Sequence, residues 1–212
     1  MDFIRRKYQL LSQTPSDIFE HLPTLCKYAS DCESVLELGV RGCVSSWAFI
    51  YGLLLNQKPK KILLMNDLLP CNIQELLIVS KQTDVMVEYC WVNDLQLVID
   101  SEVDLTFIDT WHVYGQLKRE LEKFSPITKK YIIMHDTTVD EIHGESTRLG
   151  LNIHEQCIET GWECQEIEEG LWKAIDEFLE THPEWSLHQR FVNNNGLTIL
   201  KRKDWIQMKL DL

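Results

Sequence analysis

The stretch Ser34-Val35-Leu36-Glu37-Leu38-Gly39-Val40-Arg41-Gly42 decides the fold class. Its first five residues are mostly apolar and bounded by polar residues, which predicts a buried strand over 34–38. Two glycines then mark a tight turn, and the segment 45–51 after them has the composition of a helix. A strand, a glycine turn and a helix in this order are typical of a β-α-β unit on a parallel sheet.

Outward from this stretch, short apolar runs alternate with amphipathic segments along the whole chain. This alternation predicts four more parallel strands and the helices between them. The expected strands cover 61–67, 85–90, 104–109 and 130–136, and the expected helices cover 72–81, 114–124 and 170–179. Two further strands, 185–191 and 197–202, would close a hairpin around the turn 193–196. The sequence therefore predicts an α/β fold, a doubly wound and mostly parallel seven-stranded sheet with an antiparallel C-terminal edge hairpin.

The remaining segments fit one domain over residues 1–212, because no Gly/Ser/Pro-rich linker divides the chain. Residues 1–32 predict a helical segment, in which a helix runs from Thr14 toward Tyr28 and Pro23 breaks it near His21 and Leu22. Residues 137–152 are polar and predict a loop, and residues 137–169 together predict a substrate lid.

Composition excludes several classes of protein. The chain has 21 Lys and Arg against 33 Asp and Glu, a net charge of −12, which argues against a nucleic-acid partner. No apolar run approaches the ~18–20 residues of a membrane span, and the N-terminus lacks the apolar region of a secretory signal. The seven cysteines contain no Cys-x-x-Cys pair, so we expect reduced, buried thiols and a cytoplasmic location.

The ends of the first three predicted strands could form a ligand site, since ligands bind past the carboxyl ends of parallel strands. Gly39 and Gly42 would let the backbone approach a ligand, although a plain β-α turn explains them equally well. The turn lacks both a Gly-x-Gly-x-x-Gly fingerprint and a Walker loop. Asp67 could bind a ribose diol or be a solvated strand-end residue. Asp94 could meet an adenine edge or cap a helix.

The ends of the fourth and fifth predicted strands are more informative, because each carries an aspartate and a histidine. Asp109 is followed by His112, and His135 precedes Asp136. Asp109 and Asp136 could hold a hard divalent cation, and His112 could act as a general base. Separate caps and a structural histidine are the alternative. Two such ends on successive strands favour a shared site.

Three stretches carry a resemblance to a known family. Residues 35–42 resemble motif I of class I S-adenosylmethionine-dependent methyltransferases. Residues 104–114, Asp-Leu-Thr-Phe-Ile-Asp-Thr-Trp-His-Val-Tyr, and 131–137, Tyr-Ile-Ile-Met-His-Asp-Thr, are similar to one branch of that family. The branch includes sugar O-methyltransferases and cephalosporin-hydroxylase-like proteins. The likeness covers roughly residues 14–140 and two later segments, and it implies a Rossmann-like methyltransferase fold.

The resemblance also implies roles for individual residues. S-adenosylmethionine would be bound by Glu37, Gly39, Arg41, Gly42, Ser45, Ser46, Asp67, Asp94 and Asp109. His112 would be the base, assisted by Asp109, and Mg²⁺ or Mn²⁺ would lie on Asp109, His135 and Asp136. The acceptor would meet Trp111, His112, Tyr114, Thr137 and His143. The sequence departs from the pattern at His135, where the metal-dependent enzymes carry Glu, and at Thr110-Trp111, which replaces a small Gly-x.

The function expected from these features is methyl transfer to a hydroxyl of a sugar or glycan, with a deoxyhexose such as rhamnose favoured. A methyltransferase acting on a catechol-like phenol or an amine is the first alternative. A cofactor-binding module without catalysis is the second. A nicotinamide-dependent oxidoreductase would need the third glycine that the turn lacks. A homo-oligomer is compatible with all of these.

Overall fold

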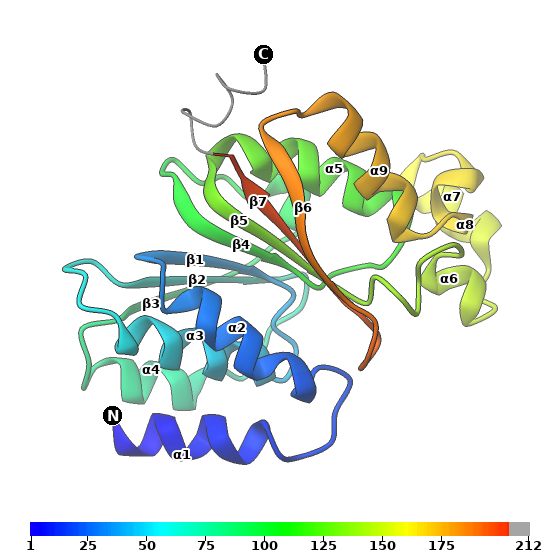
Figure 1. Cartoon of the computed structure of the whole chain (residues 1–212). Coiled ribbons are helices and arrows are strands. Elements are labelled where there is room, and N and C mark those ends of the chain that lie inside the picture. The colour runs from blue at the N-terminus through cyan, green and yellow to red at the C-terminus, as the bar shows by residue number, and fades with distance from the viewer. Residues whose placement is uncertain (204–212) are drawn as a thin grey trace. The chain divides into compact units, whose positions relative to one another are not determined.

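The computed structural model describes residues 1–203, and Figure 1 labels its elements. The chain forms two compact units. Unit 1 comprises residues 1–110 and 127–129, and unit 2 comprises residues 111–126 and the chain from 130 onward. Residues 204–212 of the predicted single domain lie outside the described residues. Among residues 1–203, no helix combines the length and apolar character needed to span a bilayer.

Unit 1 is built on four parallel strands. They are β1 (Ser34–Leu38), β2 (Ile62–Asp67), β3 (Met86–Trp91) and β4 (Val103–Ile108). β1 is flanked by β2 and β4, so that Val35 is paired with Leu63 on one side and Leu105 on the other. All five residues of β1 are buried, including Ser34 and Glu37, as expected for a central strand of a parallel sheet that is covered on both faces. β3 pairs with β2, and each of its residues is exposed or half-buried.

The helices of unit 1 are α1 (Asp2–Leu11), α2 (Leu22–Ala29), α3 (Val44–Leu55) and α4 (Gln74–Ser80), with short 3-10 turns at Phe19–His21 and Asp94–Gln96. α3 is apolar on nearly all sides and buries nine residues. The helix predicted from Thr14 is wrong in its start. The predicted break near His21 and Leu22 is confirmed, because a 3-10 turn ends at His21 and α2 begins at Leu22. Pro23 lies in the first turn of α2, where its missing N–H costs nothing.

Unit 2 contains β5 (Thr128–His135, whose first two residues belong to unit 1), β6 (Trp185–Phe191) and β7 (Leu197–Arg202). β7 pairs antiparallel with β5 and with β6. The predicted hairpin turn is confirmed, and Asn194, Asn195 and Gly196 adopt positive φ there. The helices are α5 (Tyr114–Phe124), α6 (Glu145–Arg148), α7 (Ile153–Thr160), α8 (Cys164–Glu168) and α9 (Leu171–Thr181), and a 3-10 turn covers Ser125–Ile127.

The strand order is β3-β2-β1-β4-β5-β7-β6 in a seven-stranded sheet. The strands of unit 1 are parallel, and the last two strands of the chain form the antiparallel edge. This arrangement confirms the fold class predicted from the sequence, a doubly wound Rossmann-like sheet with a C-terminal hairpin.

Two expectations about residues 137–169 are wrong. The polar segment expected to be a loop contains α6, and α7 and α8 follow it. These helices span only 4, 8 and 5 residues, so they show no clear helical period. The cysteines are not all reduced, because Cys157 in α7 and Cys164 at the start of α8 form a disulfide. The turn between these helices brings their Cα atoms to 5.4 Å, a separation that a disulfide requires.

Candidate functional site

The turn after β1 is held at very close range to the end of β4. Gly39 has φ +88°, and a Cβ added there would lie 1.8 Å from the carbonyl oxygen of Asp109. The Asp109 N–H donates to the carbonyl of Leu38 at 2.9 Å, which fixes this approach. Gly42 differs, since a Cβ there would meet nothing closer than 4.0 Å. Of the two predicted glycines, Gly39 is therefore the one required by the backbone.

Asp67, at the end of β2, fixes the turn after β1 through hydrogen bonds to its backbone. Its Oδ2 accepts hydrogen bonds from the N–H groups of Val40 and Arg41, both at 2.9 Å, and its Oδ1 accepts from Leu69 N–H at 3.0 Å. Burial alone would raise the pKa of Asp67, but these three N–H groups outweigh it and lower the pKa. The residue predicted to bind a ribose thus has a structural task in unit 1, and its ligand role stays a prediction.

Glu37 is a fully buried acid on β1. The Ser45 hydroxyl, from the first turn of α3, donates to Glu37 Oε1 at 2.5 Å, and Glu37 Oε2 has no hydrogen-bond partner among residues 1–203. Burial, with a smaller contribution from the charges of Asp109 and Asp67, outweighs the hydroxyls of Ser45 and Ser46 and raises the pKa of Glu37 to about 8. A buried carboxyl with an unsatisfied oxygen beside a backbone turn fits a ligand that brings a cationic group or a donor.

The other predicted cofactor residues occupy different positions in unit 1. Ser46 is buried in α3. Arg41 is exposed, has φ +40°, and forms an ion pair with Asp17. Asp94 is 7% exposed in the 3-10 turn after β3, and the alternative that it caps a helix is wrong. Asn93 is the cap, and its side chain accepts from Leu95 N–H.

In unit 2, the imidazole of His112 lies against three carboxylates. Its Nδ1 is 3.1 Å from Asp136 Oδ2, 3.4 Å from Asp140 Oδ2 and 3.6 Å from Glu145 Oε2. The backbone also closes around it, because Glu145 N–H donates to the His112 carbonyl at 2.8 Å. The structure therefore joins His112 and Asp136, two of the residues predicted from the sequence.

Asp140 is a site residue that the sequence reading missed. Its side chain is fully buried and accepts from Arg148 Nε at 2.5 Å and Nη2 at 3.0 Å. Burial would raise the pKa of Asp140, but His112 and Arg148 outweigh it and lower the pKa. A signal was available, since Asp140 lies four residues after Asp136 and its N–H donates to the Asp136 carbonyl.

His135 and Asp136 end β5 in an unusual geometry. Asp136 has φ +58°, a conformation that costs energy in a non-glycine residue and clusters at functional sites. His135 is 2% exposed, its Nε2 is 3.2 Å from the Asn194 carbonyl, and its Nδ1 is 3.5 Å from Asp136 Oδ2. An Nε2–H that donates to the carbonyl leaves Nδ1 as the basic nitrogen on the side of the carboxylate.

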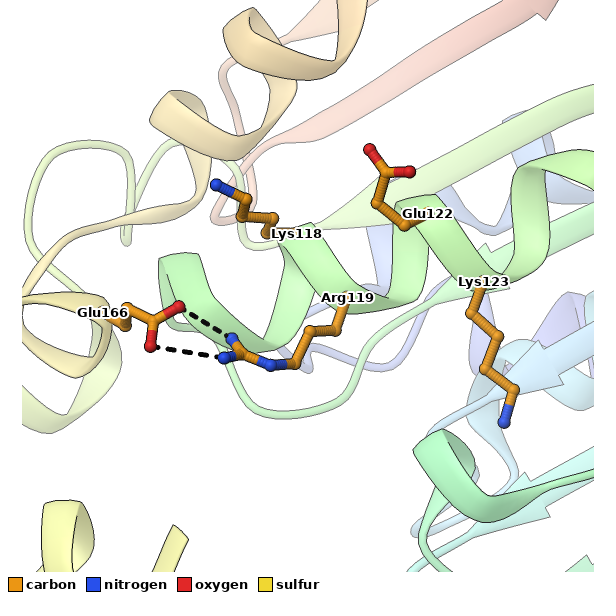
Figure 2. A pocket seen from close by; sticks show the side chains of 5 residues that line it. All are labelled: Lys118, Arg119, Glu122, Lys123 and Glu166. Carbon is orange, nitrogen blue, oxygen red and sulfur yellow. Dashed lines mark hydrogen bonds and ion pairs between the residues drawn. The ribbon is translucent and has the colours of Figure 1, made fainter. Parts of the chain in front are cut away.

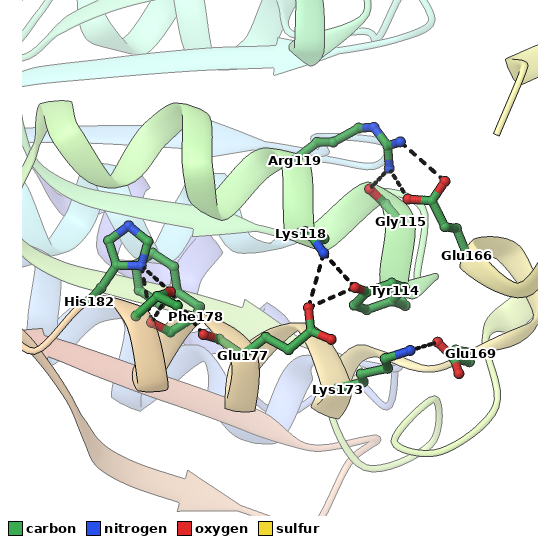
Figure 3. A network of polar contacts seen from close by, with 11 residues as sticks. Tyr114, Gly115, Lys118, Arg119, Glu166, Glu169, Lys173, Glu177, Phe178 and His182 are labelled. Atoms are coloured by element: carbon green, nitrogen blue, oxygen red, sulfur yellow. Dashed lines mark hydrogen bonds and ion pairs between the residues drawn. The ribbon is translucent and has the colours of Figure 1, made fainter. Parts of the chain in front are cut away.

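The predicted acceptor residues divide into two groups. Trp111 is half-buried, its Nε1–H donates to Ser146 Oγ at 3.2 Å, and it is the covalent neighbour of His112. Tyr114 instead donates its hydroxyl to Glu177 Oε2 at 2.7 Å within a surface network on α5 and α9 (Figure 3). Thr137 is fully buried and accepts from the Thr198 hydroxyl at 2.8 Å, and His143 is exposed. Trp111 is the member of the set best placed beside the His112 cluster.

A surface hollow of about 460 Å³ lies on the exposed side of α5. It is lined by Lys118, Arg119, Glu122, Lys123 and Glu166, and Figure 2 shows that Arg119 is paired with Glu166 across it. None of the residues predicted from the sequence lines this hollow. Mixed charge and an internal ion pair give it no preference for a charged ligand.

Comparisons with known proteins support the fold. No family model and no curated protein matches the sequence. Among solved structures, an S-adenosylhomocysteine-bound methyltransferase from Podospora anserina is 15% identical, with a TM-score of 0.59 over 96% of this chain and 89% of that chain. An O-methyltransferase from Bacillus cereus, in complex with S-adenosylhomocysteine, is 14% identical, with a TM-score of 0.57 over 96% and 91%. The N-methyltransferase NodS from Bradyrhizobium japonicum, also in complex with this ligand, is 12% identical, with a TM-score of 0.55 over 96% and 98%. The chain therefore has the fold of S-adenosylmethionine-dependent methyltransferases.

Proposed function

We propose that the chain is an S-adenosylmethionine-dependent O-methyltransferase that methylates a hydroxyl of a sugar or glycan, with His112 as the general base. The observation that carries this proposal is the His112 imidazole held by Asp136, Asp140 and Glu145 in unit 2. Neighbours of the same fold include both O- and N-methyltransferases, so the fold alone does not choose the acceptor. A hydroxyl must lose a proton to become a good nucleophile, and a built base serves that need.

On the cofactor side, the residues of unit 1 fit the predicted ligand. When bound, S-adenosylmethionine supplies a methyl group already activated by a sulfonium. The unpartnered Oε2 of Glu37 would meet a cationic or donor group of the ligand. Gly39 lets the backbone of the turn come close, and Asp67 holds that turn in place. Ser45 keeps the Glu37 carboxyl oriented.

On the acceptor side, His112 would take the hydroxyl proton at Nε2, since Nδ1 faces the carboxylates. Asp136 and Asp140 fix the orientation of the ring and stabilise the positive charge that it gains. Trp111 offers an apolar ring beside the base, which suits the C–H face of a sugar. A phenol or amine acceptor would gain less from this base, because a phenol loses its proton more easily than a sugar hydroxyl and a neutral amine is already nucleophilic.

A divalent cation on His135 and Asp136 is part of the proposal. His135 Nδ1 and the Asp136 carboxylate combine a nitrogen with oxygen ligands, which favours Mn²⁺ over Mg²⁺. Asp109, the third predicted ligand, stays a prediction from the sequence. We expect Mn²⁺ to bind chelator-treated protein, as measured by the loss of its free electron paramagnetic resonance signal. The Asp136→Asn variant should bind it at least tenfold more weakly, and equal binding would remove the cation from the proposal.

The base is tested by His112→Ala, with His188→Ala, an exposed histidine on β6, as the matched control. We expect His112→Ala to lower methyl transfer to deoxyhexosides by about 10²–10⁴-fold and to leave the affinity for S-adenosylhomocysteine within about twofold. The control should transfer methyl groups at the normal rate. Unchanged turnover in His112→Ala would remove the base assignment, and a protein that binds no S-adenosylhomocysteine by titration calorimetry would remove the whole proposal.

A further inference from the structure

Residues 157–164, which we call the disulfide turn, lie in unit 2 and are closed by the Cys157–Cys164 bond. The turn contains Gly161 in the left-handed conformation, followed by Trp162. Neither the fold nor the proposed function accounts for a covalent closure here. The contacts of Trp162 indicate what this closure holds in place.

The disulfide turn places Trp162 in contact with two other side chains, Arg119 and Trp111. One face of Trp162 is covered by the guanidinium of Arg119, at 4.1 Å from the ring centroid. Its ring also stacks on Trp111, with centroids 5.7 Å apart and planes inclined by 23°. Arg119 is itself fixed, because it donates to both carboxylate oxygens of Glu166 and to the Gly115 carbonyl (Figures 2 and 3). Trp162 is thus a bridge between a rigid ion pair and Trp111.

Trp111 connects this stack to the His112 cluster. It precedes His112 directly, and its Nε1–H donates to Ser146 in α6. The neighbouring Glu145 binds the His112 carbonyl through its N–H and lies 3.6 Å from His112 Nδ1 through its carboxylate. A change in the position of Trp111 would therefore reach the base through the chain and through α6.

The two helices joined by the disulfide are anchored very differently. α8 buries Ile167 and approaches α5 so closely that a Cβ on Gly115 would lie 2.8 Å from Glu166 Cβ. α7 has no buried residue at all. An element with so little burial has low local stability, and the covalent bond joins the end of α7 to the better-anchored α8.

We propose that the disulfide turn is a redox-sensitive clamp that positions Trp111 through Trp162. A dithiol reductant opens it: one thiolate attacks Sγ of Cys157 or Cys164, the protein S–S bond breaks, and the second thiol closes the reductant's own disulfide. Two electrons and two protons pass from the dithiol to the protein, which gains two thiols. Both cysteines are half-buried, so a small dithiol reaches them. The consequence for the acceptor rests on the proposed function, whereas the clamp itself does not.

The experiment compares oxidised protein, protein reduced with dithiothreitol, and the variant Cys157→Ser/Cys164→Ser. Peptide mapping without reduction should show the cross-linked pair in the first sample. Stacked indoles give an exciton-coupled circular dichroism signal, which should be present in oxidised protein and weakened by at least half in the other two. Hydrogen exchange over residues 153–164 should become about tenfold faster in both, while α5 and β5 stay unchanged.

Three controls make the result specific. Trp162→Phe should lack the exciton signal in the oxidised state, and Trp91→Phe, which alters an exposed tryptophan of unit 1, should keep it. Cys90→Ser removes an exposed free thiol and should respond to dithiothreitol as the parent does. An absent cross-linked peptide, or a dichroism signal and exchange rates that reduction leaves unchanged, would overturn the clamp.

The clamp and the proposed function are separated by titrating S-adenosylhomocysteine into the same samples. Binding without any response to reduction overturns the clamp alone. A response to reduction without any binding overturns the methyltransferase proposal and supports the clamp. Where both hold, reduction should raise KM for the deoxyhexoside several-fold more than it lowers kcat, since Trp162 acts as a positioning residue through Trp111.

Discussion

At the scale of single residues, Glu37 gives the clearest pH dependence. Its pKa in the folded chain is about 8, above the ordinary value of 4.5, because burial disfavours the carboxylate. The stabilisation from the protonated form is complete below pH 4.5 and is lost as the pH rises through 8. The free energy of unfolding of Glu37→Gln minus that of the parent should therefore be larger at pH 9 than at pH 5. We expect this increase to be about 3–5 kcal/mol.

Urea unfolding at the two pH values measures this difference. Glu122→Gln, which neutralises an exposed acid on α5, is the control and should show no such pH dependence. A free-energy difference between Glu37→Gln and the parent that is the same at pH 5 and pH 9 would show that Glu37 is ionised throughout.

Asp67 provides a second test at this scale. Its carboxylate accepts three backbone N–H groups, and an amide cannot replace it because one end of the amide is a donor. We expect Asp67→Asn to lower the free energy of unfolding by about 1.5–3 kcal/mol, while Asp100→Asn, at an exposed position, changes it by less than about 0.5 kcal/mol. Retained stability in Asp67→Asn would show that the turn after β1 holds without this carboxylate.

At the scale of elements, the strands were predictable, and the three short helices between residues 145 and 168 were not. β1 and β4 are short, mostly apolar segments in which every residue is buried, and segments of this kind are typical of central parallel strands. α6, α7 and α8 are too short to show a period, and their signals are local caps instead. Asn152 accepts from Glu155 N–H, and Glu163 and Glu166 form a capping box. Reading those caps would have found two of the three helices.

Of the residues around His112, those that follow a strand were predictable and those that follow no strand were not. His112 and Asp136 follow strands, so the sheet topology alone predicts that they meet. Asp140 and Glu145 follow no strand, and they reach His112 because residues 140–145 fold back in hydrogen bonds to 112, 136 and 168–171. The four-residue spacing of Asp136 and Asp140 expresses one of these contacts, whereas the contacts with residues 112 and 168–171 depend on tertiary pairing.

The disulfide between α7 and α8 should contribute to the stability of the fold. In the chain-entropy view, closing a loop over a sequence separation of 7 removes freedom from the unfolded chain. We expect Cys157→Ser/Cys164→Ser to lower the free energy of unfolding by about 2 kcal/mol in buffer without reductant. Cys71→Ser/Cys90→Ser, which alters two free thiols, should change it by much less. Equal stabilities of parent and Cys157→Ser/Cys164→Ser in urea would exclude a constraining bond.

At the scale of the whole molecule, the predicted cofactor residues and the predicted base lie on different compact units. S-adenosylhomocysteine at 100 times its Kd should stabilise the folded chain by about 2.7 kcal/mol and raise Tm by about 5–10 °C. NAD⁺ serves as the control for the oxidoreductase alternative and should leave Tm unchanged. A shift with NAD⁺ and none with S-adenosylhomocysteine would reverse the choice between these two ligands.

The contrast between Gly39 and Gly42 has a consequence for mutational tolerance. A side chain at position 39 would run into the main chain at position 109, and main chain cannot rotate away as a side chain can. A Cβ at position 42 would meet only the Val44 side chain, at an ordinary contact distance of 4.0 Å. In a saturation library selected for folded protein, position 39 should retain glycine alone, whereas position 42 should accept alanine, serine and larger residues. Natural sequences with this fold should likewise keep glycine at position 39 and vary at position 42. Residue 39 is therefore a better marker of shared fold than the number of glycines in this turn.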